Sequence, residues 1–135
     1  LDPLTGLRNR TSFNELLEQA LGSEDVDGRL LAVAYIDIDH FKRVNDNFGH
    51  DVGDQLLKEL GHRIQASVKH SDTVARLGGD EFALIMHLTV PDDLEVVASR
   101  LLACIRQPFQ LGPHSIQSSV SVGFALAIAG DTASA

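Results

Sequence analysis

The sequence predicts an α/β domain of the α+β type, with a mixed, largely antiparallel central sheet and helices packed on it. Segments with helical periodicity alternate with strand-like apolar runs along the 135 residues, which favours helices layered on a sheet. The Gly78-Gly79 pair lies between two strand-like runs and predicts a tight antiparallel hairpin. Because a doubly wound parallel sheet has no such hairpin between its crossovers, we exclude that class.

The N-terminal half is expected to contain three helices and one strand. Ser12 and Glu15 match a capping box at the start of the first helix. A polar, acidic loop follows, and then a nearly all-apolar run, as expected of a strand covered on both faces. A short helix and a longer amphipathic helix complete this half. These segments are the helix Ser12–Leu21, the loop Gly22–Gly28, the strand Leu30–Ile38, the helix Phe41–Phe48 and the helix Val52–Val68.

The C-terminal half is expected to contain the hairpin, one helix and a last strand. Pro91-Asp92 opens the helix, whose apolar residues stay in helical register. In the last strand, apolar residues alternate with small or polar ones, which predicts one buried face. A tail of small residues follows. These segments are the strands Thr73–Leu77 and Phe82–Leu88, the helix up to Ile105, the strand Ile116–Ile128 and the tail Asp131–Ala135.

Composition and charge exclude several classes of partner. The net charge of -8 argues against a nucleic-acid surface, although metal ions let an acidic protein bind an anion. No apolar run approaches the roughly 20 residues that cross a bilayer, so we expect no direct membrane contact. The single cysteine, Cys104, lies in an apolar helical pattern and is expected to be a core residue of a reducing compartment. We therefore expect a cytoplasmic domain, whose parent protein the sequence leaves free to be membrane-anchored.

Two acidic clusters lie at strand ends. Asp37 and Asp39 share one face at the end of a buried strand, where carboxylates are costly unless they are paired, solvated or bound to metal. Mg²⁺ prefers a few carboxylates together with phosphates and water. Asp80 and Glu81 follow the hairpin glycines and, as strand neighbours, are expected to face opposite sides, so that only one joins Asp37. Spacing alone leaves open that Asp37 and Asp39 merely favour the start of the next helix.

The segment Phe41–Asp54 places amides, acids and a histidine around two glycines at a helix–helix turn. An Asp and an Asn together can match the N1–H, N2 amine and N3 of guanine, because a carboxylate accepts while an amide donates and accepts. The alternative is that these side chains only satisfy the backbone of the turn.

Three motifs, in this order, resemble the GGDEF family, the diguanylate cyclase domain of bacterial signalling proteins. Asp2–Arg10 resembles the family's N-terminal motif, and Asp37–Asp54 resembles its metal and guanine segment. Gly78–Phe82 is identical to the signature that names the family. The resemblance extends from Asp2 to about Ala127, and residues 1–135 are expected to be a single GGDEF domain.

This resemblance implies a fold like the palm of polymerases and class III nucleotide cyclases. It implies that two GTP molecules are joined into cyclic di-GMP with release of two pyrophosphates. Mg²⁺ is the implied cofactor, with Mn²⁺ as an alternative. One domain holds one GTP, so a homodimer is needed for catalysis, and fusion to sensor or phosphodiesterase domains is expected. A catalytically silent GTP-binding regulatory module, attached to such a domain, is the alternative function, and a dimerisation scaffold is a third.

The resemblance also assigns residues. Asp37, the carbonyl of Ile38 and Asp80 are implied metal ligands. Asp80 is also the implied general base for the attacking 3′-hydroxyl, and Glu81 is a supporting acid. Substrate binding is assigned to four residues. Asn45 and Asp54 are implied to bind the guanine edge. His50 has a less certain nucleotide contact, and Lys42 is implied to lie near the phosphates.

Two departures from the family pattern have consequences. The family's Arg-x-x-Asp product-inhibition site reads Lys69-His70-Ser71-Asp72 here. Lysine lacks the planar guanidinium fork, so even with a contribution from Arg76 we expect feedback inhibition to be weak or absent. The family also continues with a helix, carrying a Lys and an Arg that hold the triphosphate, and a final strand. We therefore expect this chain to be a C-terminally truncated form of the domain.

Overall fold

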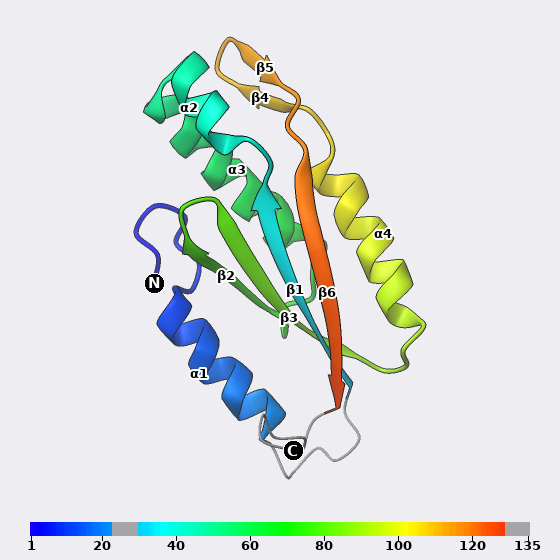
Figure 1. The fold of residues 1–135 in the computed structure, drawn as a ribbon. Coiled ribbons are helices and arrows are strands. Elements are labelled where there is room, and N and C mark those ends of the chain that lie inside the picture. Colours follow the sequence, from blue (N-terminus) through cyan, green and yellow to red (C-terminus); the bar gives the residue numbers. More distant parts are fainter. Residues whose placement is uncertain (23–29, 129–135) are drawn as a thin grey trace.

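The computed structural model describes residues 1–22 and 30–128, and it confirms the predicted α+β class (Figure 1). A four-stranded sheet has the order β2-β3-β1-β6, and each of its neighbouring strands is antiparallel. One isolated parallel bridge joins Arg8 to Ala75. The main elements are α1 (Arg10–Leu21), β1 (Leu30–Ile38), α2 (Phe41–Phe48), α3 (His50–Ser67), β2 (Thr73–Gly78), β3 (Glu81–Leu88), α4 (Asp93–Ile105) and β6 (Val120–Ile128).

Helices cover both faces of the sheet, as the apolar sequence of β1 predicts (Figure 1). Alternate residues of β1, such as Ala34 and Ile36, pack in the larger core with α3 and α4. The residues between them, such as Leu31 and Val33, pack in a smaller core with Phe13 of α1. Because successive side chains of a strand point to opposite faces, one strand contributes to both cores.

Three sequence expectations need correction or fall outside the described residues. The N-cap of α1 is Asn9, whose side chain accepts a hydrogen bond from the backbone N of Ser12 at 2.9 Å, so the predicted capping box at Ser12 is wrong. Asn is as good an N-cap as Ser, and the helix begins one turn earlier. Most of the predicted loop Gly22–Gly28 lies outside the described residues, and so does the tail Asp131–Ala135.

The last predicted strand, Ile116–Ile128, begins too early. Only Val120–Ile128 forms β6, and Ile116 is the last residue of a separate strand. Residues before β6 form a small hairpin of β4 (Phe109–Leu111) and β5 (His114–Ile116), which was not predicted. Its turn contains Gly112 with φ of 62°, a left-handed conformation that favours glycine. The Gly112-Pro113 pair is the signal that could have revealed this turn. The ring of His114 contacts the ring of Phe48, so the hairpin packs against the end of α2.

A buried charge pair connects the N-terminal segment to the hairpin between β2 and β3. Nη1 of Arg76 donates a hydrogen bond to Oδ1 of Asp2 at 2.9 Å, and Nε and Nη2 of Arg76 donate to the carbonyl of Gly79. The other carboxylate oxygen of Asp2 accepts hydrogen bonds from the backbone N and hydroxyl of Thr5. Asp2 is only 8% exposed, so these bonds replace its lost hydration.

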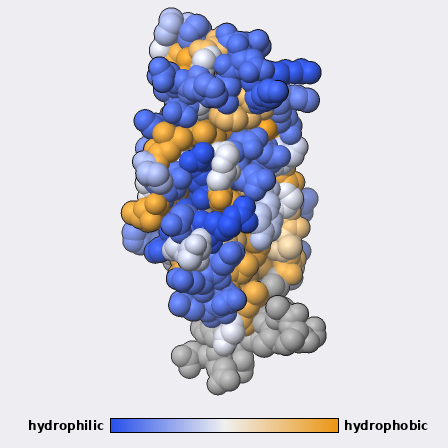
Figure 2. Space-filling view, turned by 60° about the vertical axis from the view of Figure 1, so that its left-hand side comes forward, coloured by the Kyte–Doolittle hydropathy of each residue, from blue (hydrophilic) through white to orange (hydrophobic). Residues whose placement is uncertain are grey.

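The surface on the side of α1 is mostly hydrophilic, with separate apolar patches between the polar residues (Figure 2). Among the helices of residues 1–22 and 30–128, none has both the length and the apolar composition needed to cross a bilayer.

Candidate active site

The pairing of β1 with β3 brings the two acidic clusters together. Asp37 is the cross-strand partner of Glu81, and the backbone N of Ile38 donates to the carbonyl of Asp80 at 3.4 Å. Gly78, the last residue of β2, and Gly79, the first residue of the turn, both have positive φ, which glycine adopts without strain. Asp80 lies in this turn, before the first residue of β3, and its carboxyl group lies within hydrogen-bonding reach of the Asp37 carboxyl.

This geometry corrects the expected arrangement of the two hairpin acids. Asp80 and Glu81 do not alternate along a strand, because only Glu81 belongs to β3. Asp80 meets Asp37, whereas Glu81 forms an exposed salt bridge with Nη2 of Arg10 at 3.5 Å. A single acid of the pair therefore joins Asp37, as expected, but the reason is the turn rather than opposite strand faces.

The electrostatics of Asp37 fit a cation. Burial raises the pKa of Asp37, and the hydrogen bond and negative charge of Asp80 raise it further. A positive charge placed between the two carboxylates would oppose this repulsion. In the described part of the chain, no group of three or more His, Cys, Asp or Glu side chains is arranged to hold a metal ion. Two carboxylates with ligands from a substrate are the arrangement that Mg²⁺ uses with phosphates, so the residues present fit that ion.

Asp39 has different surroundings from Asp37. Its carboxylate accepts hydrogen bonds from the hydroxyls of Ser121, at 2.6 Å, and Ser119, at 3.0 Å. These two bonds lower the pKa of Asp39. The resemblance assigned no metal or substrate role to Asp39, and neither serine was among the predicted site residues. Their i,i+2 spacing was visible, but local sequence does not reveal that β6 is the neighbour of β1.

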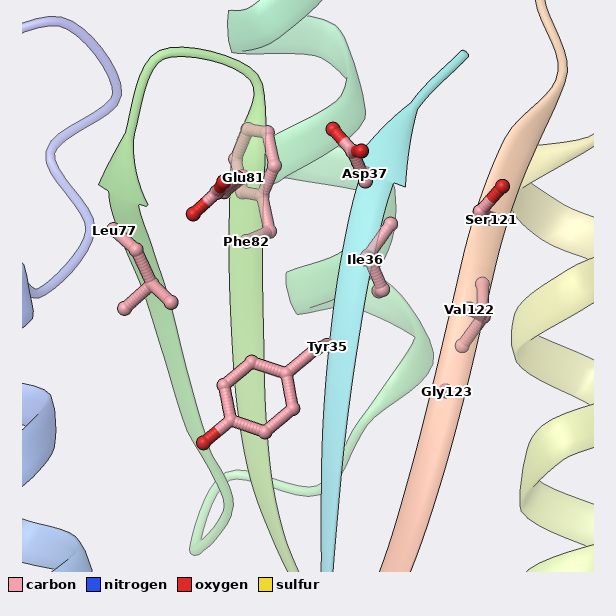
Figure 3. Close-up of a pocket in the computed structure, with 9 residues that line it drawn as sticks. All are labelled: Tyr35, Ile36, Asp37, Leu77, Glu81, Phe82, Ser121, Val122 and Gly123. Atoms are coloured by element: carbon pink, nitrogen blue, oxygen red, sulfur yellow. The ribbon is translucent and has the colours of Figure 1, made fainter.

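A cavity of about 480 Å³ opens on the α1 side of the sheet beside Asp37. Figure 3 shows its lining side chains, with Asp37 and Ser121 near the ends of their strands and Tyr35 lower on the sheet. Tyr35 is 49% exposed, so α1 leaves this portion of the face uncovered. The residues assigned to guanine do not line this cavity, which is therefore a separate space next to the acid pair.

The guanine candidates lie around the turn between α2 and α3. Gly49 has φ of 92° and connects the two helices, and its backbone N donates to the carbonyl of Asn45 at 2.8 Å. A Cβ atom at Gly53 would overlap Oδ1 of Asn45, so the glycine leaves room for the Asn45 side chain in its observed position between the two helices. His50 and Asp54 are exposed and lie one turn apart at the start of α3, on the same side of the helix.

Lys42 is exposed in the first turn of α2, close to the end of β1. Its position follows from the two-residue turn that connects β1 to α2. Figure 1 shows the end of β1, the hairpin and the α2–α3 turn at the same end of the molecule. The candidate metal ligands and the candidate substrate residues therefore share one end of the sheet.

The residues predicted to form a degenerate inhibitory site lie in two separate places. Asp72 accepts hydrogen bonds from the backbone N atoms of Lys69 and His87, at 3.0 and 3.1 Å, before the start of β2. Nζ of Lys69 donates to the carbonyl of His87. Arg76 lies near the other end of β2 and is engaged with Asp2 and Gly79. Lys69 and Asp72 thus form a local turn, and Arg76 belongs to a different cluster.

A family model described as "Diguanylate cyclase, GGDEF domain" matches residues 1–135. Two curated relatives come from Pseudomonas aeruginosa. The cyclic di-GMP phosphodiesterase NbdA is 44% identical over 125 residues, which are 93% of this chain and 16% of that protein. The bifunctional diguanylate cyclase/cyclic di-GMP phosphodiesterase MucR is 46% identical over 125 residues, 93% of this chain and 18% of that protein.

A solved structure of the GGDEF domain of TpbB from Pseudomonas aeruginosa is also similar. It has a TM-score of 0.85 and 39% identity, and the match covers 93% of this chain and 74% of that chain. The matched region is less than a fifth of the length of NbdA and of MucR.

Proposed function

Because the chain belongs to the GGDEF family of diguanylate cyclase domains, we propose that it condenses two GTP molecules into cyclic di-GMP, with Mg²⁺ and across a homodimer. The observation that carries this proposal is the convergence of the Asp37 and Asp80 carboxyl groups at the glycine turn. Their mutual repulsion favours a cation there, and an acidic protein needs such a cation to hold a triphosphate.

Asp37, the carbonyl of Ile38 and Asp80 hold the metal in this proposal. Bound Mg²⁺ neutralises charge that develops on the phosphoryl oxygens and lowers the pKa of the nucleophile. Asp80 accepts the proton of the 3′-hydroxyl. Glu81, which forms a salt bridge with Arg10, is a supporting acid that adds negative charge near the metal. Mn²⁺ is the alternative ion, since it also takes oxygen ligands.

The α2–α3 turn binds the base and orients the nucleotide. Asn45 and Asp54 supply the donor and acceptor groups that match the guanine edge, with His50 next to them. Lys42 lies near the phosphates as a point charge. Holding the reacting groups in position accounts for much of the rate in phosphoryl transfer, so this rigid glycine-dependent turn contributes to catalysis as well as to specificity.

The reaction needs two copies of the domain that face each other. The 3′-oxygen of each GTP attacks the α-phosphorus of the other, so two P–O bonds form while the bonds to two pyrophosphates break. Each attacking 3′-hydroxyl loses its proton to an Asp80 carboxylate. In this proposal, each copy of the domain contributes its acid pair and its guanine turn.

The test is to incubate the full-length protein with GTP and MgCl₂ and to quantify cyclic di-GMP by mass spectrometry. We expect product from the wild type and a loss of about 10²–10⁴-fold in Asp80→Asn, the range expected when a general base is removed. The matched control is Glu18→Gln, which removes one charge from the exposed side of α1 and keeps full activity. Absence of product from a forced dimer of the complete domain would refute the enzyme assignment.

A second candidate is a catalytically silent GTP-binding module that regulates an attached phosphodiesterase or sensor domain. The similarity to NbdA, a phosphodiesterase, and to MucR, a bifunctional protein, favours it. This candidate predicts GTP binding that survives Asp80→Asn without product from the wild type. In either case we expect weak or absent product inhibition, because Lys69 lacks the guanidinium fork and its backbone closes a turn with Asp72.

A further inference from the structure

Asp39 connects the end of β1 to the edge strand β6. It is the first residue after β1, and its backbone N donates to the carbonyl of Ser119 at 2.9 Å. Its two carboxylate oxygens accept one serine hydroxyl each, Oδ2 from Ser119 and Oδ1 from Ser121. One residue thus makes three hydrogen bonds to the start of β6, two to Ser119, which directly precedes the strand, and one to Ser121 within it. They lie immediately beyond the last paired position, where Ile38 lies opposite Val120.

The turn that Asp39 anchors has little support of its own. The next residue, His40, has φ of 57° and ψ of 35°, a left-handed conformation that is unfavourable for a residue with a side chain. His40 is also the N-cap of α2, and its side chain makes no capping hydrogen bond. A turn of this kind persists when surrounding contacts hold it. The contacts between Asp39 and β6 do so.

The same turn carries the groups of the proposed metal site. Ile38 precedes Asp39 directly, and Asp37 lies opposite Ser121 in the register of β1 and β6. A shift of the turn would therefore move the Ile38 carbonyl and the start of α2 together. Movements of about 1 Å are enough to impair a site that depends on positioning.

We propose that Asp39 is a positioning residue, which holds the Asp37–Ile38 end of β1 and the start of α2 through the hydroxyls of Ser119 and Ser121. This inference rests on the proposed function. It assigns different roles to the two acids of the Asp37-Ile38-Asp39 sequence. Asp37 acts through its negative charge on the cation, whereas Asp39 acts through two hydrogen bonds to serine hydroxyls.

The distinction can be tested because asparagine keeps the hydrogen bonds and loses the charge. The amide oxygen of Asp39→Asn accepts one hydroxyl, and its NH₂ group donates to the other serine oxygen. Asp39→Ala removes both bonds, and the double variant Ser119→Ala/Ser121→Ala removes them from the other side. Asp37→Asn is the reference for loss of charge, and Glu18→Gln is the control for net charge.

The measurement is Mn²⁺ binding to the full-length protein with α,β-methylene GTP, followed by the electron paramagnetic resonance signal of free Mn²⁺. We expect Asp39→Ala and the double serine variant each to weaken binding about 10-fold, as observed when groups that orient metal ligands are removed. Asp39→Asn should stay within about threefold of the wild type. The triple variant Asp39→Ala/Ser119→Ala/Ser121→Ala should bind no worse than Asp39→Ala, because both remove the same two side-chain hydrogen bonds.

Each contrary result has a distinct meaning. If Asp39→Asn weakens binding as much as Asp37→Asn, Asp39 acts through its charge and the inference is wrong. A neutral serine double variant would also overturn it, and this variant and Asp39→Asn decide the matter even if Asp39→Ala fails to fold. If the wild type binds no Mn²⁺ with nucleotide, the proposed function fails together with the inference. If the wild type binds and only Asp37→Asn weakens it, the function stands and the inference fails.

Discussion

Asp2 and Asp37 both approach the hairpin between β2 and β3, yet their electrostatic surroundings are opposite. Burial acts to raise the pKa of Asp2, but the hydrogen bonds from Thr5 and the Arg76 guanidinium outweigh it, so this pKa is lowered. The pKa of Asp37 is raised by burial and by the neighbouring Asp80 carboxyl. The Asp2 cluster contains its own cation, whereas the Asp37 cluster brings two acids together.

The difference indicates what each cluster contributes. The paired Asp2 stabilises the fold, because it attaches the N-terminal segment to Gly79 through Arg76. The repulsion between Asp37 and Asp80 lowers the stability of the fold. Such strongly perturbed acids are typical of catalytic and ligand-binding sites. Both clusters contact the turn between β2 and β3, so the hydrogen bonds of Arg76 to Asp2 and Gly79 support the turn in which Asp80 lies.

The largest expected effect is the loss of the Asp2 cluster. Asp2→Ala should lower the free energy of unfolding by about 3 kcal/mol, because it leaves the mostly buried Arg76 guanidinium without its acid. Asp37→Ala should cause no such loss. Urea denaturation of both variants measures the difference, with Glu18→Gln as the control. Equal losses in the two variants would show that the clusters do not differ in this way.

The second effect is a pH dependence of opposite sign at the two residues. The lowered pKa of Asp2 means that its contribution to stability is complete above its unfolded value of 3.8 and is lost as the pH falls through the folded pKa. For Asp37, whose pKa is raised, the contribution is complete below 3.8 and is lost as the pH rises through the folded pKa.

Asp2→Asn should therefore destabilise the protein at neutral pH and flatten its acid-induced loss of stability. Asp37→Asn should stabilise the metal-free protein at neutral pH and have little effect near pH 3. Urea midpoints measured at several pH values in the presence of a chelator give both profiles. A decrease in the neutral-pH midpoint of Asp37→Asn would contradict the assigned repulsion.

The smallest effect is expected at the exposed ion pair beside the acid cluster. The side chains of Arg10 and Glu81 are 58% and 56% exposed, so solvent screens their attraction. Removing the pair in Arg10→Ala should change the free energy of unfolding by less than about 1 kcal/mol. A double-mutant cycle with Glu81→Gln isolates the interaction. A coupling energy as large as that between Asp2 and Arg76 would mean that solvent exposure does not determine the strength of these two ion pairs.

Long and regular segments were predictable from the sequence. The apolar run of β1 and the amphipathic pattern of α3 are strong because many residues agree with one period. Short segments, and segments with two equally good alternatives, were not predictable. Asn9 and Ser12 are equally good N-caps, and the three-residue strands β4 and β5 offer too few residues for a period. The acids at positions 37 and 80 were identifiable, but the placement of Asp80 in the turn was not.

The sequence by itself determined which residues are charged, where the glycine turns lie and which positions of each element are apolar, since these depend on residues that are near in the chain. Only the tertiary structure decided that Arg76 meets Asp2, 74 residues away, and that Ser121 meets Asp39, 82 residues away. Strand order is set by packing two helical layers onto a single sheet, and local periodicity carries no information about which strands become neighbours.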